Sequence, residues 1–167
     1  TKHSLTHTVA RKEANKQGVS VITMPGIDED MFFNGAINAD YQRVEEETLA
    51  MAERLTEATE VIIETGEAYA LRIPLGDREG IASTGVFRHR AASGNLPSGE
   101  AFIAPLENEA TGKIEINGSI AGIGLLSEAT VLTIEAGRLI DATGEAGRQL
   151  LTLLGDGEGR LLGELGI

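Results

Sequence analysis

The sequence contains no cysteine and no tryptophan, and its other aromatic residues are few. Without cysteine the chain forms no disulfide and offers no thiolate to a metal, so a metal site must use carboxylates or histidines. Aromatic residues make up only 4% of the chain, whereas 41% of its residues are hydrophobic. We therefore expect a hydrophobic core of useful size that is built mostly from Ile, Leu, Val and Ala.

Long apolar runs are also missing from the sequence. No segment approaches the roughly 20 consecutive apolar residues that a membrane-spanning helix needs. The chain also does not open with the basic and then apolar pattern of a secretion signal. These features predict a cytoplasmic protein that does not enter a membrane.

Positive charge is scarce, with 14 Lys and Arg residues against 26 Asp and Glu residues and a net charge of -12. Such a field repels nucleic acid and anionic membranes, and it favours cationic partners such as metal ions or amines. The alternative is that the acidity only keeps the protein soluble. The charge alone does not distinguish these two explanations.

Residues 1–65 alternate between helical and strand patterns. Because this region holds too few strands for a stable open sheet, we interpret it as the end of an N-terminal α/β domain with a partial Rossmann-like layer. The domain would begin upstream of the chain. The expected elements are a helix capped by Ser4 or Thr6 that runs to about Gln17, a strand at 19–24, a short helix at 28–33, a helix from Asp40 to about Ala58 and a strand at 60–65.

Residues 66–167 are β-rich and contain one late helix. We expect a truncated portion of a second domain, because the chain stops within the apolar run GELGI at 163–167. The fold class is therefore α/β or, more closely, α+β. The expected elements are strands at 68–75, 101–106 and 113–117, a hairpin at 130–140 and a helix at 145–154.

Two acidic residues occupy positions that favour chemistry. The segment 94–105 reads GNLPSGEAFIAP, so a turn rich in Gly and Pro delivers Glu100 to the start of an apolar strand. Glu164 is flanked by Gly163 and by an apolar run in a similar way. Carboxylates from separate elements are the ligands that hard or borderline divalent ions need. The alternative is that Glu100 is a solvated turn residue.

The segment GNLPSGE with the following Ala104-Pro105 resembles the signature of the thermophilic metallo-aminopeptidase family, of the aminopeptidase T or leucyl aminopeptidase type. Residues 4–8 (SLTHT) and 24–27 (MPGI) resemble an upstream block of that family, and 163–167 (GELGI) resembles a later one. The blocks follow in the family's order over nearly the whole chain. The resemblance therefore implies an internal fragment of a metal-dependent aminopeptidase.

By this resemblance, Glu100 and Glu164 match the first two metal-ligand carboxylates of the family, and the second predicted domain is its metal-site domain. The family's remaining ligands, which are His, Tyr, His and Asp, lie further downstream. The resemblance implies two divalent ions of the zinc or cobalt class in the intact enzyme, a peptide substrate and a homodimer. With only two ligands, the fragment alone is expected to be inactive.

The three histidines are weaker candidates for function. His3 and His7 are four residues apart, which is a spacing compatible with a metal, but no third ligand lies near them in the sequence. His89 lies between Arg88 and Arg90 and is expected in a solvated loop. We assign none of them to the metal site.

Two other functions stay open at this point. The same resemblance includes iron-dependent ring-opening dioxygenases that act on dihydroxypyridine, and their metal ligands would also lie mostly downstream. The other alternative is a non-catalytic module for folding or dimerisation. Iron content and oxygen uptake distinguish the first alternative from a peptidase.

Overall fold

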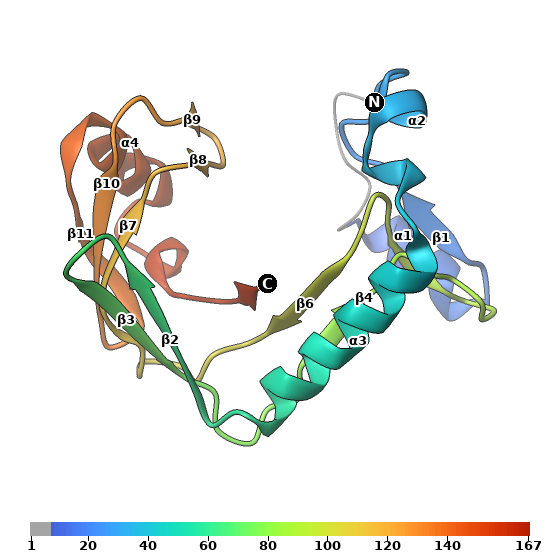
Figure 1. Ribbon diagram of the computed structural model, residues 1–167, viewed down its shortest axis with the longest axis horizontal. Coiled ribbons are helices and arrows are strands. Elements are labelled where there is room, and N and C mark those ends of the chain that lie inside the picture. Colours follow the sequence, from blue (N-terminus) through green and yellow to red (C-terminus); the bar gives the residue numbers. More distant parts are fainter. Residues whose placement is uncertain (1–7) are drawn as a thin grey trace. The chain divides into compact units, whose positions relative to one another are not determined.

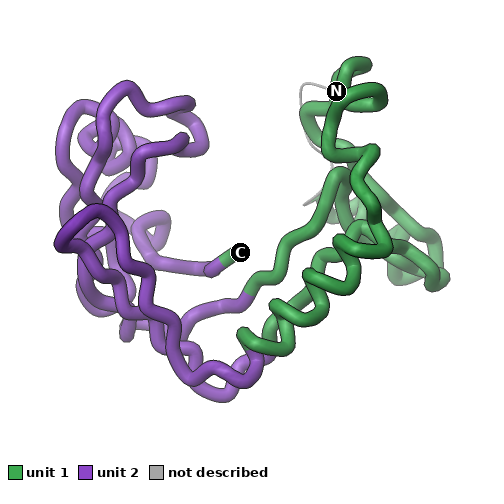
Figure 2. Tube along the Cα trace, viewed as in Figure 1, with its two compact units in different colours: residues 1–55, 80–102, 166–167 green, residues 56–79, 103–165 purple. Residues whose placement is uncertain are grey.

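The computed structural model describes residues 8–167 and divides them into two compact units (Figure 2). Unit 1 contains the described residues up to Leu55 together with Gly80–Phe102 and Gly166–Ile167. Unit 2 contains Thr56–Glu79 and Ile103–Leu165. The chain therefore passes between the units several times. The units do not follow the predicted division at residue 65, which concerned the domains of the whole protein and stays a prediction.

Unit 1 begins with helix α1 (Val9–Lys16) and the short strand β1 (Val21–Thr23). The Thr8 hydroxyl caps α1 by accepting a hydrogen bond from the Arg11 amide, so the described helix starts later than predicted. The predicted caps Ser4 and Thr6 lie outside the described residues. Strand β1 pairs in parallel with β5 (Ser93–Asn95), which the sequence did not predict.

Helix α3 (Tyr41–Glu57) is the longest helix of unit 1 and agrees with the predicted helix. The Asp40 carboxylate accepts hydrogen bonds from the amides of Gln42 and Arg43, as expected for a residue that caps a helix. Thr48, Ala52 and Leu55 are buried and recur every three or four residues, so they form one apolar face. Two short helices precede it, α2 (Met31–Asn34) and η1 (Ala36–Asn38).

A three-stranded sheet lies beside α3 (Figure 1). Its strand order is β12-β6-β4. The sequence predicted β6 but not its two neighbours. The bounds are Ile81–Ser83 for β4, Glu100–Ile103 for β6 and Leu165–Gly166 for β12.

Unit 2 is built on a five-stranded antiparallel sheet with the order β11-β10-β7-β3-β2. Each strand agrees in place with one predicted from the sequence. Ala136 and Gly137 form the tight turn between β10 and β11, and both have positive φ, as hairpins of this kind require. The bounds are Glu60–Thr65 for β2, Tyr69–Pro74 for β3, Thr111–Ile116 for β7, Thr130–Glu135 for β10 and Arg138–Ala142 for β11.

The remaining elements of unit 2 are short, apart from helix α4 (Gly144–Leu154), which was predicted. Strands β8 (Ser119–Ile120) and β9 (Gly124–Leu125) form a small hairpin. A single helical turn, η2 (Glu158–Arg160), follows α4. Within the described residues, no helix has both the length and the apolar character needed to cross a bilayer.

Aliphatic side chains form the core, as the composition predicted. In unit 2, Ile73 is 1% exposed and Leu75 is fully buried, and in unit 1 Leu55 and Ala101 are buried. Every hydrophobic residue in the buried core of the described chain is Ala, Leu or Ile. The core therefore depends on close aliphatic packing rather than on large aromatic rings.

The predicted α+β fold class is confirmed. The predicted order of helix, strand, helix and strand is also present in the first 65 residues, but its two strands join different sheets. Strand β1 finds its partner in β5, whereas β2 pairs with β3 through a tight turn. These two strands therefore do not form a Rossmann-like layer with each other, because their partners lie later in the chain.

Candidate metal centre

Glu100 is the first residue of β6, and its side chain is exposed. It stands opposite Ser83 in the antiparallel pairing of β6 with β4. The next residue, Ala101, is 1% exposed. Since successive side chains of a strand point to opposite faces, Ala101 faces the core of unit 1 and Glu100 faces away from it.

The Glu100 carboxylate lies directly over Gly166. A Cβ atom built on Gly166 would be 2.3 Å from the Glu100 Oε1 atom, which is far inside van der Waals contact. The backbone around Gly166 is held beside β6, because the amide and carbonyl of Ile167 form hydrogen bonds of 2.9 and 3.0 Å with Ala101. A side chain at position 166 would therefore displace the carboxylate from this place.

No described residue donates a hydrogen bond to the Glu100 carboxylate or forms an ion pair with it. Glu45 in the same unit shows the contrast. A hydrogen bond from Arg88 lowers the pKa of Glu45 below its ordinary value. Among residues 8–167, Glu100 has no such partner, so these residues leave its oxygens available to a cation.

The turn that leads to Glu100 has an unusual backbone. The Leu96-Pro97 peptide bond is cis, and Gly99 has a φ of 143°. A Cβ atom on Gly99 would also lie 2.9 Å from the Val44 Cγ1 atom of α3. Both the backbone conformation and the lack of space therefore require glycine immediately before Glu100.

Glu164 is exposed and lies two residues before Gly166. The residue after it, Leu165, is buried and begins β12. In the described chain, no ion pair or side-chain hydrogen bond involves Glu164. Glu100 and Glu164 fall on either side of the division between the two units.

Between residues 8 and 167, no three His, Cys, Asp or Glu side chains are grouped closely enough to hold a metal ion. His89 is exposed in a loop, as expected. His3 and His7 lie outside the described residues. Glu100 and Glu164 therefore stay predicted ligands, and the described residues do not bring a third candidate close to either of them.

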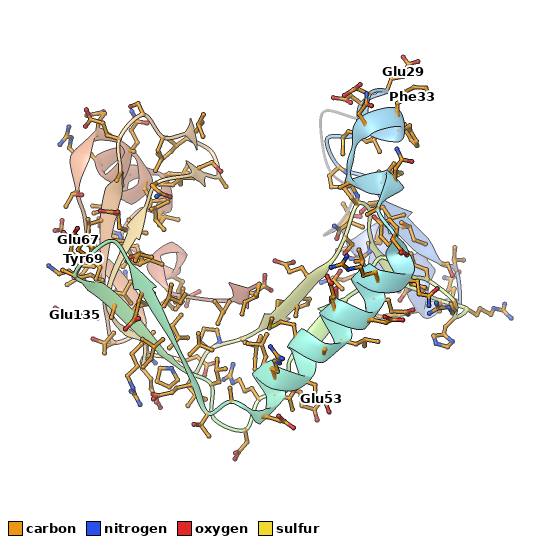
Figure 3. All side chains as sticks on the ribbon, viewed as in Figure 1. Glu29, Phe33, Glu53, Glu67, Tyr69 and Glu135 are labelled. Atoms are coloured by element: carbon orange, nitrogen blue, oxygen red, sulfur yellow. The ribbon has the colours of Figure 1, made fainter. Side chains whose placement is uncertain are left out.

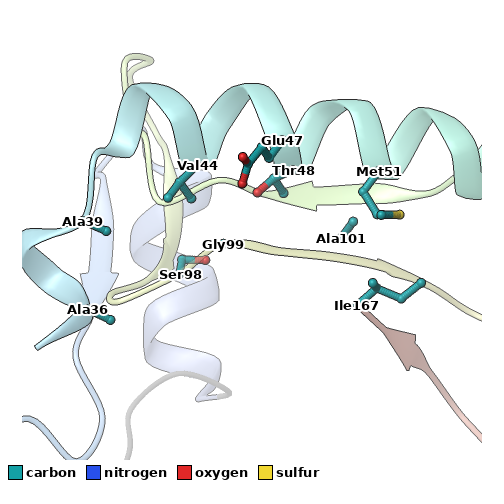
Figure 4. Close-up of a pocket in the computed structure, with 10 residues that line it drawn as sticks. All are labelled: Ala36, Ala39, Val44, Glu47, Thr48, Met51, Ser98, Gly99, Ala101 and Ile167. Carbon is teal, nitrogen blue, oxygen red and sulfur yellow. The ribbon is translucent and has the colours of Figure 1, made fainter.

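A cavity of about 360 Å³ lies in unit 1 between α3 and β6 (Figure 4). Apolar side chains from Val44, Met51 and Ala101 line much of it. Since Ala101 lines this cavity and Glu100 faces away, the cavity and the carboxylate lie on opposite faces of β6. We therefore do not assign this cavity to the candidate metal site.

Acidic side chains are spread over both units rather than gathered at one place. Glu29 and Glu53 are exposed in unit 1, and Glu67 and Glu135 are exposed in unit 2 (Figure 3). The negative charge of the chain is therefore distributed over both units. It favours the approach of any cation without choosing a site for it.

The family model described as thermophilic metalloprotease (M29) matches residues 34–167. The chain belongs to the thermophilic metalloprotease (M29) family. The match covers Glu100, Glu164 and all of the β-rich second half. Membership of the M29 family confirms the resemblance found in the sequence, and it implies a divalent metal as cofactor.

Two solved structures share the fold of this M29 chain. The first is 2,5-dihydroxypyridine dioxygenase from Pseudomonas putida KT2440, with a TM-score of 0.77 and 18% identity over 97% of this chain and 48% of that chain. The second is wild-type AmpT from Thermus thermophilus, with a TM-score of 0.61 and 22% identity over 87% of this chain and 40% of that chain. No curated protein sequence matches.

The M29 chain spans less than half the length of either solved structure. This coverage agrees with the prediction that the chain is part of a longer protein. At these identities, both likenesses show the fold alone.

The sequence predicted Glu100 as a candidate ligand but did not predict which residues lie against it. Gly166 was noted only as part of an apolar run, and nothing in its sequence context shows which side chain approaches it. The flexible Gly-Glu-Leu-Gly pattern at 163–166 was the one signal that could have indicated a close approach. The partner at β6 lies too far away in the sequence to be predicted.

Proposed function

We propose that this chain is the part of a metal-dependent aminopeptidase that supplies two carboxylate ligands, Glu100 and Glu164. The observation that carries the proposal is the exposed Glu100 carboxylate at the start of β6, which lies against Gly166 and has no hydrogen-bond or ion-pair partner among the described residues. A carboxylate without such a partner has its oxygens free to bind a metal ion.

The chemistry of the donor set fits a divalent metal. Carboxylate oxygens bind hard and borderline divalent ions, and no Lys or Arg side chain of the described residues pairs with Glu100. Chain connectivity supports the choice of Glu164 as the second ligand, because two residues of extended chain span at most about 7 Å. Its backbone therefore stays near Gly166, which itself lies against Glu100.

In the proposed enzyme, Glu100 and Glu164 hold the metal and the acidic surface attracts the ammonium group of the peptide substrate. When bound, divalent ions of the zinc or cobalt class activate water and polarise the scissile carbonyl group. A centre with two metals needs more ligands than two carboxylates, so residues beyond those described complete it. A cytoplasmic location and a homodimer belong to the proposal on the basis of the sequence expectations alone.

Hydrolysis of an aminoacyl p-nitroanilide by the complete protein tests this function. We expect activity that chelation removes and added Zn²⁺ or Co²⁺ restores, and no cleavage of the same substrate once its amino group is acetylated.

Glu100→Gln or Glu164→Gln should lower kcat/KM by more than about a hundredfold, since even residues behind metal ligands contribute 10–100-fold. Glu128→Gln is the matched control, because Glu128 is exposed and lies outside the proposed site. Undiminished activity in Glu100→Gln would rule the proposal out.

A dioxygenase is the second candidate, because the structure of 2,5-dihydroxypyridine dioxygenase matches 97% of this chain. The metalloprotease family match favours the peptidase. Iron in the purified complete protein, together with oxygen uptake in the presence of 2,5-dihydroxypyridine and no peptidase activity, would favour the dioxygenase.

A further inference from the structure

Two serine hydroxyls fasten the turn that precedes Glu100 to the neighbouring strand β4. The Ser98 hydroxyl donates a hydrogen bond of 2.7 Å to the Ser83 carbonyl. The hydroxyl oxygens of Ser83 and Ser98 are also 2.7 Å apart. Because each hydroxyl carries one proton, Ser83 is then the donor in this second bond. The two serines therefore hold each other through a reciprocal pair of bonds.

Ser83 also contacts Glu100 through the sheet, since the two residues are opposite each other in the pairing of β4 with β6. Ser98 is connected to Glu100 through Gly99 alone. The four residues thus form a short closed ring of covalent bonds, sheet pairing and hydroxyl hydrogen bonds. A ring of this size leaves the backbone of Glu100 little freedom to move relative to β4.

Helix α3 also contacts the turn that precedes Glu100. The Tyr41 hydroxyl accepts a hydrogen bond of 3.4 Å from the Ser98 amide. The Tyr41 ring itself packs against Gly85, where a Cβ atom would be only 2.4 Å from the ring. Val44, one turn later on α3, packs against Gly99. The turn is therefore held from the helix and from the strand at once.

We propose that Ser83, Ser98 and Tyr41 are positioning residues for the metal ligand Glu100. They set the backbone from which the carboxylate extends, and Gly166 leaves space for the carboxylate itself. The inference rests on the proposed metal-binding function of Glu100. It adds three residues that do not touch the metal and act only through the turn at 96–99.

Cobalt binding to the complete protein, after removal of its metal, tests this inference. We expect Ser98→Ala to weaken Co²⁺ binding measured by calorimetry by about tenfold, in line with other residues that orient metal ligands. The visible absorption of bound Co²⁺ should also change, because it reports the arrangement of the ligands. Tyr41→Phe keeps the ring against Gly85 and removes the hydroxyl, so we expect a smaller loss in the same direction.

Two controls separate positioning from folding. Ser83→Thr keeps the hydroxyl and should bind Co²⁺ as the wild type does, whereas Ser83→Ala should behave as Ser98→Ala. Ser93→Ala changes an exposed serine of the same unit and should have no effect. Thermal unfolding of each metal-free variant shows that the protein compared is folded.

The outcomes distinguish the inference from the function on which it rests. If the wild type binds no Co²⁺, or if Glu100→Gln binds it equally well, both fail. If Glu100→Gln weakens binding but folded Ser98→Ala, Ser83→Ala and Tyr41→Phe all match the wild type in affinity and absorption, only the positioning role fails. Weaker binding and altered absorption in folded Ser98→Ala and Ser83→Ala, with binding like that of the wild type in Ser83→Thr, support it.

Discussion

At the scale of single residues, two glycines lie next to Glu100, one before its backbone and one against its carboxylate. Gly99 takes a backbone conformation that other residues rarely adopt, and Gly166 leaves room that no side chain would leave. A larger residue at Gly99 and a larger residue at Gly166 would displace different side chains. A Cβ on Gly99 meets the packed Val44 side chain of α3, whereas a Cβ on Gly166 meets only the end of the Glu100 side chain. Gly166 therefore offers a way to disturb the ligand without disturbing the fold.

We predict that Gly166→Ala lowers metal affinity while leaving stability nearly unchanged. The new methyl group would push the carboxylate aside, and a flexible side chain can move at little cost. We expect metal binding by the complete protein to weaken by about tenfold, measured by calorimetry, with a thermal unfolding midpoint close to that of the wild type. Gly118→Ala, where a Cβ would meet nothing within 4 Å, serves as control. Equal affinities in both variants would contradict the role given to Gly166.

At the scale of elements, helix α3 is tied to the loop that follows β4. Arg88 of this loop forms an ion pair with Glu45 of the helix, and both side chains belong to unit 1. The hydrogen bond between Arg88 and Glu45 lowers the pKa of the Glu45 carboxyl group and raises the pKa of the Arg88 guanidinium group. The same helix carries Tyr41 and Val44, so its position matters to the turn before Glu100.

The Glu45 contact should make stability depend on pH in one direction. A carboxyl group whose pKa is lowered by folding stabilises the folded state above its unfolded pKa, about 4.3 for Glu. This contribution is lost as the pH falls through the lowered pKa. We therefore expect Arg88→Gln to be less stable than the wild type near pH 7, in thermal unfolding, and equally stable in strong acid. Arg90→Gln, which removes a nearby exposed arginine, is the control. A difference that persists undiminished in acid would contradict this explanation.

The long elements could be predicted from sequence, whereas the pairing between them could not. Helix α3 shows a cap at Asp40 and a helical stripe, and the β10–β11 hairpin has a turn marked by Gly137. Strands β4, β5 and β12 have two or three residues each, which is too short to show an alternating pattern. These short strands hold the candidate site together. The sequence could therefore propose a candidate ligand, but it could not predict the residues that surround this candidate.

At the scale of the whole molecule, we propose that the chain supplies part of a metal site. The described residues offer two candidate ligands and no group of three, and the chain spans less than half of each solved structure it resembles. Family membership still implies a divalent metal. A family metal and only two candidate ligands in this chain are consistent with each other if other parts of the protein complete the coordination of the metal.

We accordingly predict that the 167-residue chain, expressed alone, binds Zn²⁺ weakly and hydrolyses no aminoacyl p-nitroanilide. Two carboxylates seldom hold a divalent ion tightly in water, because most of its ligands would remain water molecules. Calorimetric titration with Zn²⁺ measures the affinity. Tight binding with a fixed stoichiometry would show that this chain contains a complete site.

The most direct test of the central claim is the metal content of the complete protein after dialysis, compared for the wild type, Glu100→Gln, Glu164→Gln and the control Glu128→Gln. If Glu100 and Glu164 are metal ligands, the first two variants lose bound metal while the control retains as much as the wild type. Full retention of metal by Glu100→Gln and Glu164→Gln would contradict the account.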